Sequence, residues 1–500
     1  MMRTILPLVR LALPAILLAG CVIGPRYYGP PAAESEAPAH FKGELNRNWK
    51  IAQPGGRQAR VDWWRIFGEP GLDRLEVQAL AANQDLRVAT ARIQESRAQT
   101  RAAAADFYPS LALDARGQRT RTSNTLPFQR GKFLGNNPFG MGGGTTGGAP
   151  PVITNQPLTT TQNDFRVPAE LSWELDLFGR VRQQYRAARA EAEAIEADFQ
   201  GMRLSVTANV AASYFMLRAA DSERAVIEQA LKGRREGLRI ANERLQAGLT
   251  SELDVARAQA DLAANEAALL GLERSRAEME NALATLIGQP ASEVRIAPQP
   301  LREGRVPRIP AGLPSELLER RPDVARAERE LAAANAHIGI ARAAFFPQIR
   351  LTGTGGFESA DLGLLFNPAS RFWQIGPSIH LPIFDGGRNL ANLRVTQAQY
   401  EEALARFRGQ VLIAFQEVET ALSESRTLSG EAEAQGRVAV AAERALELSR
   451  QSYEKGAVNF LDVLDAERTL LQTQRTQAQL SGRQVLATLQ LIKALGGDWD

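Results

Sequence analysis

The feature that most constrains the fold of this chain is an internal duplication that covers most of its 500 residues. Gly248 and Asp254 recur 208 positions later as Gly456 and Asp462. Each glycine separates two long helical patterns and reads as a tight turn, because only glycine enters the left-handed conformation freely. A repeat of this length predicts that one supersecondary unit is built twice. The chain should therefore present two equivalent helix-turn-helix tips.

Long helices dominate the prediction. Apolar residues after Gly179 step alternately by four and three, which is a heptad seam, and no proline interrupts the pattern before about Gln246. At 1.5 Å per residue this helix is about 100 Å long. Helices 72–105 and 251–287 together match that length, so the three should form a rod; helix 315–344 opens the second repeat. The seam residues are Val181, Tyr185, Ala188, Ala192, Ile195, Phe199, Met202 and Val206.

Period-two alternation predicts four strands, two in each repeat. Apolar and polar residues alternate strictly over 165–177, and shorter runs at 111–115, 349–353 and 375–383 follow the same pattern. Four strands cannot close a barrel, because small barrels need about eight and an open edge is not tolerated in lipid. About 9–11 residues suffice for a membrane-crossing strand, so several chains should share one barrel.

The other segments are interpreted from composition. Segment 117–163 contains the run Gly142–Gly148 and is expected to be a flexible surface loop. It is not a phosphate-binding loop, because no Gly-Lys-Ser/Thr opens a helix after it. The predicted organisation is an extended segment 21–60, a first repeat 61–290, a Pro-rich linker 291–314 and a second repeat 315–500.

The N-terminus resembles a bacterial export signal. Arg3 precedes an apolar run, 5–18, that is too short to span a bilayer comfortably. The run ends Leu-Ala-Gly-Cys, and Cys21 is the only cysteine. The alternative is a short hydrophobic segment with a chance cysteine, but the sequence is similar to a lipobox. That resemblance implies a signal peptide 1–20 and lipidation of Cys21; Val22, instead of aspartate, favours the outer membrane.

Charge and motif content exclude several function classes. The 59 basic and 56 acidic side chains become 57 and 56 once Arg3 and Arg10 are removed with the signal peptide, and both signs are mixed throughout, so no nucleic-acid partner is expected. His40, His337 and His380 are scattered without ligand spacing. No nucleophile motif or nucleotide loop stands out. We therefore expect no enzyme activity, cofactor, catalytic residue or metal site.

Short motifs occur in a specific order along nearly the whole mature chain: Cys21-Val-Ile-Gly-Pro-Arg-Tyr27, Trp63-Trp64, Gly71-Leu-Asp-Arg-Leu75, Asn83-Gln-Asp-Leu86, Asp176-Leu-Phe-Gly-Arg180, Phe384-Asp-Gly-Gly-Arg388 and the two tips. Together they resemble TolC-like outer-membrane factors, most closely the lipoprotein branch (NodT or OprM type) of RND drug-efflux systems. The resemblance implies an α+β membrane protein. It would be a homotrimer with a shared twelve-stranded β-barrel in the outer membrane and a long α-helical tunnel across the periplasm.

The resemblance also implies a gate at the tunnel tip. It assigns Asp254 and Tyr453 to a link between helix pairs, and Asp462 and Asp465 to an acidic ring at the bore. A trimer would then place six carboxylates around one axis, so we expect a constriction that acid loosens and cations block. The alternative is that these aspartates only favour the first turns of helices, where the helix dipole stabilises carboxylates.

One feature of the family gate is missing. The second link of the family uses an arginine and a threonine, but Val458 and Leu253 occupy those positions. That link is therefore absent, and Leu461 is a candidate for apolar closure. The two turns are expected to dock a periplasmic adaptor, because small residues allow another helix hairpin to approach closely. The docking residues are Gly248, Leu249, Thr250, Ser251, Gly456, Ala457, Val458 and Asn459.

The predicted function is a passive exit duct for small toxic compounds, supplied by an inner-membrane RND transporter through the adaptor. Two alternatives stay open: the duct of a type I protein secretion system, and a lipid-anchored coiled-coil scaffold without a pore. The period-two strands argue against the scaffold, which needs no surface for outer-membrane lipid.

Overall fold

The computed structural model describes residues 23–29, 62–121, 161–302, 307, 309 and 320–497. The chain divides into two compact units. The sheet unit contains Met1–Gly24, Ala102–Gln183 and Gly339–Ala391, and the helical unit contains Pro25–Arg101, Gln184–Ile338 and Asn392–Asp500. The predicted signal peptide, Cys21 and the run Gly142–Gly148 lie outside the described residues.

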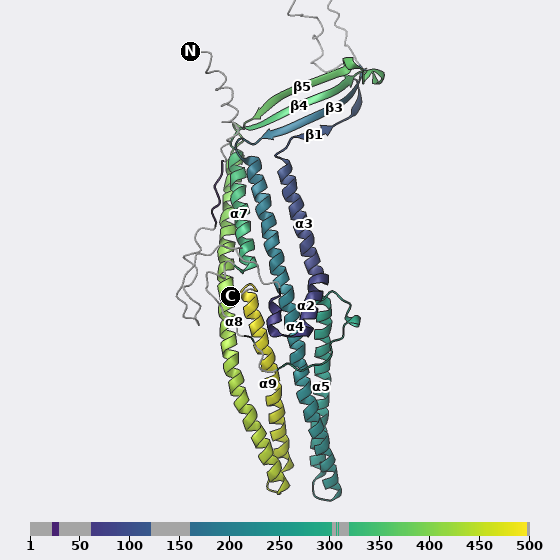
Figure 1. Cartoon of the computed structure of the whole chain (residues 1–500), viewed down its shortest axis with the longest axis vertical. Coiled ribbons are helices and arrows are strands. Elements are labelled where there is room, and N and C mark those ends of the chain that lie inside the picture. Colours follow the sequence, from purple (N-terminus) through teal and green to yellow (C-terminus); the bar gives the residue numbers. More distant parts are fainter. Residues whose placement is uncertain are drawn as a thin grey trace, which may run out of the picture. The chain divides into compact units, whose positions relative to one another are not determined.

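The sheet unit is built on one antiparallel sheet (Figure 1). The strand order is β1-β3-β4-β5, and β2 pairs with β3 beside β1. Long alternating runs form these strands because period two places one set of side chains on each face. The bounds are β1 Ser110–Leu113, β2 Arg116–Arg121, β3 Thr161–Leu175, β4 Gln348–Ser359 and β5 Arg371–His380.

A proline explains why β1 and β2 are separate strands in one register. Asp114 lies between β1 and β2, and its amide donates to the Pro168 carbonyl at 3.1 Å. The backbone polar groups of Pro168 in β3 therefore point toward β1 and β2. Proline has no N–H to return that bond, and the ladder is interrupted there. On the other side Pro168 lies opposite Gly356, where a Cβ atom would be 2.1 Å from the Val167 carbonyl oxygen.

The boundaries of two predicted segments need correction. The loop predicted at 117–163 is wrong at both ends, because β2 continues to Arg121 and β3 begins at Thr161. The polar residues there read as loop, but they pair across the strands, as in the bond from Gln118 Nε2 to Asp164 Oδ2 at 3.0 Å. The run predicted to 383 ends with β5 at His380, shortly before a proline.

The sheet has one apolar and one polar face. Leu111, Leu171, Gly353 and Ile375 lie in one row across the four strands. On the opposite face Arg166 and Arg350 form ion pairs with Glu358 and Glu174, at 3.5 and 3.7 Å. Apolar side chains on the two outer strands are exposed, namely Leu111, Leu113, Trp373, Ile375 and Ile379.

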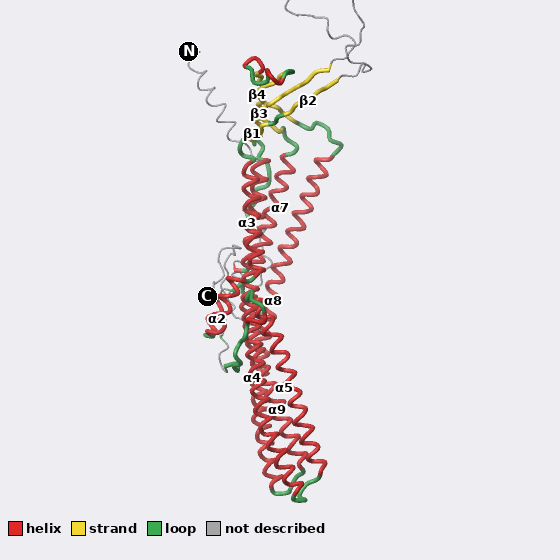
Figure 2. Tube along the Cα trace, turned by 90° about the vertical axis from the view of Figure 1, so that its right-hand side faces the viewer, coloured by secondary structure: helices red, strands yellow, loops and turns green. Residues whose placement is uncertain are grey.

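The helical unit confirms the predicted long helices (Figures 1 and 2). α4 (Arg180–Gln246) and α8 (Arg388–Glu454) each have 67 residues. α5 (Glu252–Leu286) and α9 (Phe460–Ala494) each have 35. The helices thus recur at the predicted spacing of 208 positions. Among the described residues, no helix is both long and apolar enough to cross a membrane.

Buried aromatic and aliphatic residues together form the main core of the helical unit. The short 3-10 helix η2 (Trp63–Phe67) packs against α4, where Phe67 and Phe215 have ring centroids 4.9 Å apart. The indole N–H of Trp63 donates to Thr207 Oγ1 at 3.1 Å. Burial of large aromatic side chains fixes this segment, and a second cluster around Phe407 joins α8 to the end of α9.

The helix predicted over 72–105 is two helices, α2 (Pro70–Ala82) and α3 (Gln84–Ala105), broken at Asn83. The Asn83 side chain accepts from the Leu86 amide at 3.1 Å and donates to the Leu286 carbonyl at 2.9 Å. Asparagine therefore caps the start of α3 and satisfies the end of α5. The helical pattern alone does not reveal such a break, because flanking residues are good helix formers.

The second repeat has the same break 238 positions later. Of the helix predicted over 315–344, residues 315–319 lie outside the described residues, Arg320 is helical, and α7 runs from Pro322 to Ala343 after the break. Arg321 precedes proline, which disfavours the helical conformation. Its guanidinium donates to the Ala494 carbonyl at 2.8 Å, the counterpart of the bond that Asn83 makes. The division into repeats 61–290 and 315–500 with a linker stays a prediction.

Candidate functional site

The candidate gate is built from the two tips, which lie at the same end of the helical unit (Figure 1). Gly248 and Gly456 both have a φ of 75°. The Leu249 amide donates to the Arg244 carbonyl at 2.8 Å, and the Ala457 amide makes the equivalent bond to Ser452 at 2.9 Å. These are Schellman helix ends, which need a residue in the left-handed region. The duplication is therefore preserved in backbone detail at the tips.

Asp254 is bound within its own tip. Its Oδ2 accepts from the hydroxyls of Thr250 at 2.9 Å and Ser251 at 3.0 Å, while Ser251 Oγ accepts from the Asp254 amide at 3.3 Å. Partial burial alone would raise the pKa of the Asp254 carboxyl, but these bonds and nearby Arg257 hold it below its usual value. The carboxylate is thus held charged at the start of α5.

Asp462 has the matching position in the second tip. Asn459 and Asp462 form a capping box, in which Asp462 Oδ2 accepts from the Asn459 amide at 3.0 Å. The alternative role of these aspartates in helix initiation is therefore realised for Asp254 and Asp462. It does not exclude a second role at a bore, because Asp462 is exposed.

Asp465 lies one turn further along α9 and is not part of the cap. Its side chain is 64% exposed, and its Oδ1 lies 3.8 Å from a terminal nitrogen of Arg468. Leu461 is 38% exposed, whereas Val463 and Leu464 are buried. One face of the first turns of α9 therefore presents Leu461, Asp462 and Asp465 together, without a covering element among the described residues.

Tyr453 contacts a residue that sequence reasoning missed. The Arg244 guanidinium lies over the Tyr453 ring, 4.7 Å from its centroid, and Phe460 packs against the same ring at 5.5 Å. Arg244 belongs to α4 and Tyr453 to α8, so a cation–π contact joins the two tips. Asp254 has its contacts in the first tip. The link between Asp254 and Tyr453 stays a prediction.

The duplication gave no signal for Arg244. Its counterpart 208 positions later is Ser452, and the counterpart of Tyr453 is Leu245. The one hint was the position of Arg244 in the last turn of a long helix. A basic side chain there is stabilised by the negative end of the helix dipole.

Most of the docking residues predicted at the tips are exposed, whereas Thr250 and Val458 are half-buried. Leu249 is 68% exposed. A Cβ atom added to Gly248 or Gly456 would meet no atom within 4 Å, although the positive φ would strain it. The glycine of each turn is therefore accessible, as the predicted docking of another hairpin requires. Docking itself stays a prediction.

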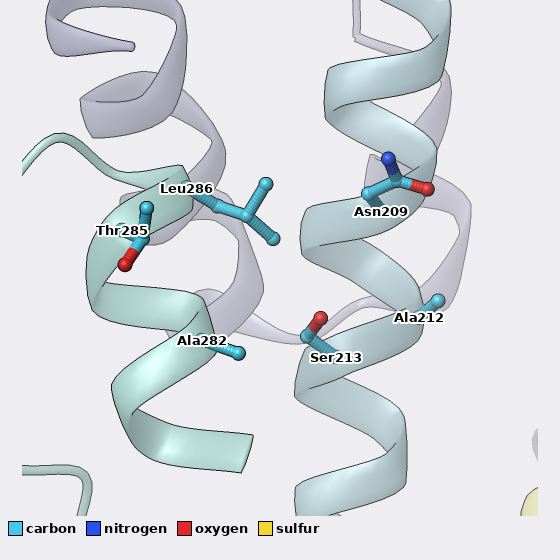
Figure 3. A pocket seen from close by; sticks show the side chains of 6 residues that line it. All are labelled: Asn209, Ala212, Ser213, Ala282, Thr285 and Leu286. Atoms are coloured by element: carbon cyan, nitrogen blue, oxygen red, sulfur yellow. The ribbon is translucent and has the colours of Figure 1, made fainter. Parts of the chain in front are cut away.

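A separate hollow of about 470 Å³ lies between α4 and α5 (Figure 3). Its lining has no ionisable side chain, so it offers only hydrogen bonds and apolar contacts. None of the predicted gate or docking residues lines it. The lining residues are Asn209, Ala212, Ser213, Ala282, Thr285 and Leu286.

The described residues contain no cluster of His, Cys, Asp and Glu that could hold a metal ion. His337 lies 3.2 Å from Glu191, on the surface of the helical unit, and His380 ends β5. His40 and Cys21 lie outside the part of the chain that is described. The expectation that the protein has neither a metal nor a catalytic set stays a prediction.

Comparisons with known proteins give a consistent result. Residues 75–289 and 313–497 match the family model described as outer membrane efflux protein. The chain is 31% identical to the cation efflux system protein CusC of Escherichia coli K12, over 97% of each chain. It is 32% identical to the toluene efflux pump outer membrane protein TtgI of Pseudomonas putida, also over 97% of each. The solved CmeC outer membrane channel of Campylobacter jejuni is similar in fold, with a TM-score of 0.81, 26% identity and 96% coverage of each chain.

Proposed function

The chain belongs to the outer membrane efflux protein family, and on that premise we propose that it is the passive exit duct of a tripartite RND pump, gated at its helical tips. Its place as an outer-membrane channel protein of an efflux system follows from the family. The predicted resemblance and the TolC-like α+β fold are confirmed. The tripartite arrangement, the gate and the absence of catalysis are the proposal.

The sheet is the observation that carries the proposal. Its apolar face is continuous across four strands, and among the described residues β5 pairs only with β4, while β1 and β2 pair only with β3. Exposed apolar side chains on strands with free edges need lipid and neighbouring strands. Three chains with four strands each would close a barrel of twelve, which supports a homotrimer in outer-membrane lipid.

The proposed partners follow from the tips and from the names of the relatives. The exposed, small-residue turns at Gly248 and Gly456 suit a helical hairpin of a periplasmic adaptor. The adaptor would connect the duct to an inner-membrane RND transporter that supplies the energy.

The relatives do not specify the cargo of this chain. CusC is named for cations and TtgI for toluene, although each is similar to this chain over 97% of its length. Relatives of one family are thus named for chemically different substrates. We therefore propose small toxic compounds as a class and assign substrate choice to the pump.

Lipidation of Cys21 is part of the proposal. Its support is the Leu-Ala-Gly-Cys sequence after an apolar run. Mass spectrometry of the mature N-terminal peptide should show a diacylglyceryl-modified Cys21, and Cys21→Ser should lose the modification. An unmodified Cys21 in protein purified from the outer membrane would refute this part alone.

Single-channel conductance in a planar bilayer tests the function. Purified wild type should conduct weakly, and Asp254→Ala/Tyr453→Ala should conduct more, because both tip contacts are lost. No conductance from correctly inserted trimers of either protein would favour the scaffold alternative. Secretion of a polypeptide by a cognate exporter would favour the type I alternative.

A further inference from the structure

The two helical hairpins of one chain, α4–α5 and α8–α9, meet along a seam between α4 and α9. A Cβ atom on Gly482 of α9 would lie only 2.7 Å from Cβ of Ala219 on α4. The two helices run in opposite directions, so toward the tips the residue numbers of successive contacts rise along α4 and fall along α9. The seam therefore leads from this close approach toward the tips.

The next contact along the seam is a buried carboxylate. Glu223 of α4 has a side chain that is 9% exposed and accepts from Arg475 Nε at 2.9 Å and from Gln479 Nε2 at 3.0 Å. Both donors belong to α9. A buried carboxylate with charged and polar donors fixes the register of the two helices.

Closer to the tips than Glu223, Asp261 of α5 binds two arginines from different hairpins. Its side chain is 5% exposed, its Oδ2 accepts from Arg234 Nε of α4 at 2.5 Å, and its Oδ1 accepts from Arg468 Nε of α9 at 2.8 Å. Arg468 lies about two turns into α9, and the preceding turns of this helix carry Asp462 and Asp465. Asp261 thus connects the first hairpin directly to the helix that presents the predicted acidic ring.

We propose that Asp261 is a positioning residue for the gate: its bond to Arg468 holds the start of α9, with Asp462 and Asp465, in the closed position, and breaks when the tip opens. This inference rests on the proposed gating and adds a closure contact behind the tip itself.

The geometry makes this bond suitable for breaking and reforming. Breaking a buried ion pair is costly when it leaves a charge unpaired. Here Asp261 keeps Arg234 within its own hairpin when Arg468 leaves. Arg468 is 52% exposed and has Asp465 3.8 Å away on its own helix, so water and that carboxylate can replace Asp261. Both partners therefore have a stable alternative in the open position.

Hydrogen exchange of the detergent-solubilised trimer tests the anchoring. In Arg468→Ala, amides of residues 460–475 should exchange about tenfold faster than in wild type, because a hydrogen bond to a charged group is lost. Arg450→Ala is the matched control. It removes a similar ion pair, 2.7 Å to Glu467, that joins α8 to α9 inside the second hairpin. Equal exchange in Arg468→Ala, Arg450→Ala and wild type would overturn the proposal.

Conductance tests the link to gating. Arg468→Ala should conduct more than wild type, Arg450→Ala should not, and Arg468→Lys, which keeps the charge and most of the reach, should restore the wild-type level. Faster exchange without higher conductance would also overturn the proposal, because α9 would be anchored without a role in closure. Failure of the channel function itself is distinguishable, since wild type would then not conduct at all.

Discussion

At the tips, aspartate carboxylates stabilise the starts of helices, and some of them are also exposed to solvent. Asp254 and Asp462 bind hydroxyls or amides of their own turns, whereas the Asp465 carboxylate lies 3.8 Å from Arg468, its one ion pair among the described residues. The sequence predicted where these aspartates lie, because glycine turns and helix starts are local features. It did not predict the Arg244–Tyr453 or Asp261–Arg468 contacts. Those depend on how two hairpins more than 200 residues apart in sequence pack together.

The different partners of the two ring aspartates predict different effects on cation block. Asp465→Asn should raise the divalent-cation concentration for half-block of the channel by about tenfold, because an exposed carboxylate free of the cap is removed. Asp462→Asn should have a smaller effect, since that carboxylate already accepts from the Asn459 amide. Conductance titrations with Mg²⁺ measure both. Wild-type conductance that ignores divalent cations and pH would contradict the acidic-ring prediction.

A buried acid in α2 predicts pH-dependent stability. Glu76 is fully buried, and neither of its oxygens has a hydrogen-bond partner in the part of the chain that is described. Burial, with the nearby Asp73 carboxylate, raises its pKa from 4.5 to about 9. In the unfolded chain it ionises near 4.5, so its contribution is fully present below that pH. It is lost as pH rises to about 9, at up to about 1.4 kcal/mol per pH unit.

Thermal unfolding at pH 5 and pH 8 tests the role of Glu76. Wild type should lose stability at pH 8 relative to pH 5, and Glu76→Gln should remove much of that loss, because the amide cannot ionise. Glu278→Gln, at an exposed position of α5, serves as the control and should leave the pH dependence unchanged. An unchanged pH dependence in Glu76→Gln would contradict the assignment.

At the scale of helices, periodicity predicted lengths well and interruptions poorly. The heptad seam gave α4 to within a residue or two at each end, since apolar spacing runs the whole length of the helix. Nothing in that spacing marks the breaks at Asn83 and Arg321. They are set by carbonyl groups of α5 and α9, which accept from these side chains. Contacts that are distant in sequence thus decide where a pattern that looks continuous divides.

The break at Asn83 predicts a measurable loss of stability. Asn83→Ala removes the cap on the Leu86 amide and the bond to the Leu286 carbonyl, so the free energy of unfolding should fall by about 2 kcal/mol. Gln94→Ala, an exposed amide on α3, is the control and should change it by less than about 0.5 kcal/mol. Chemical denaturation followed by circular dichroism measures both. Equal stability of the two variants would show that Asn83 does not fix the break.

At the scale of the whole molecule, alternation predicted a sheet that one chain leaves unfinished. The predicted strands and their two faces agree with the register of β3, β4 and β5. The extension of β2 and β3 into the predicted loop was missed, because polar residues paired across strands look like loop residues in a single sequence. How the chains assemble follows from the family and from the unfilled sheet edges rather than from any residue pair.

The apolar face predicts a side-specific response to charge. Ile375→Arg should reduce assembly into the outer membrane strongly, because an arginine facing the middle of the lipid costs about 2–4 kcal/mol. Gln374→Arg, on the adjacent residue and the opposite face, should assemble normally. Heat-modifiable trimer on SDS gels, made from isolated outer membranes, measures the difference. Equal assembly of both variants would place Ile375 away from lipid.

The bonds at the two helix breaks have an evolutionary consequence. In both repeats the acceptor is a main-chain carbonyl, Leu286 in one and Ala494 in the other, and no point mutation deletes a main-chain carbonyl. Any side-chain donor long enough to reach this carbonyl preserves the contact at the helix break. Asn83 and Arg321 are two different residues that make it in the two repeats of one chain. Genetic drift at these two positions is therefore tolerated. The common origin of the two repeats is visible in the matching backbone break, although the residues at the break have diverged.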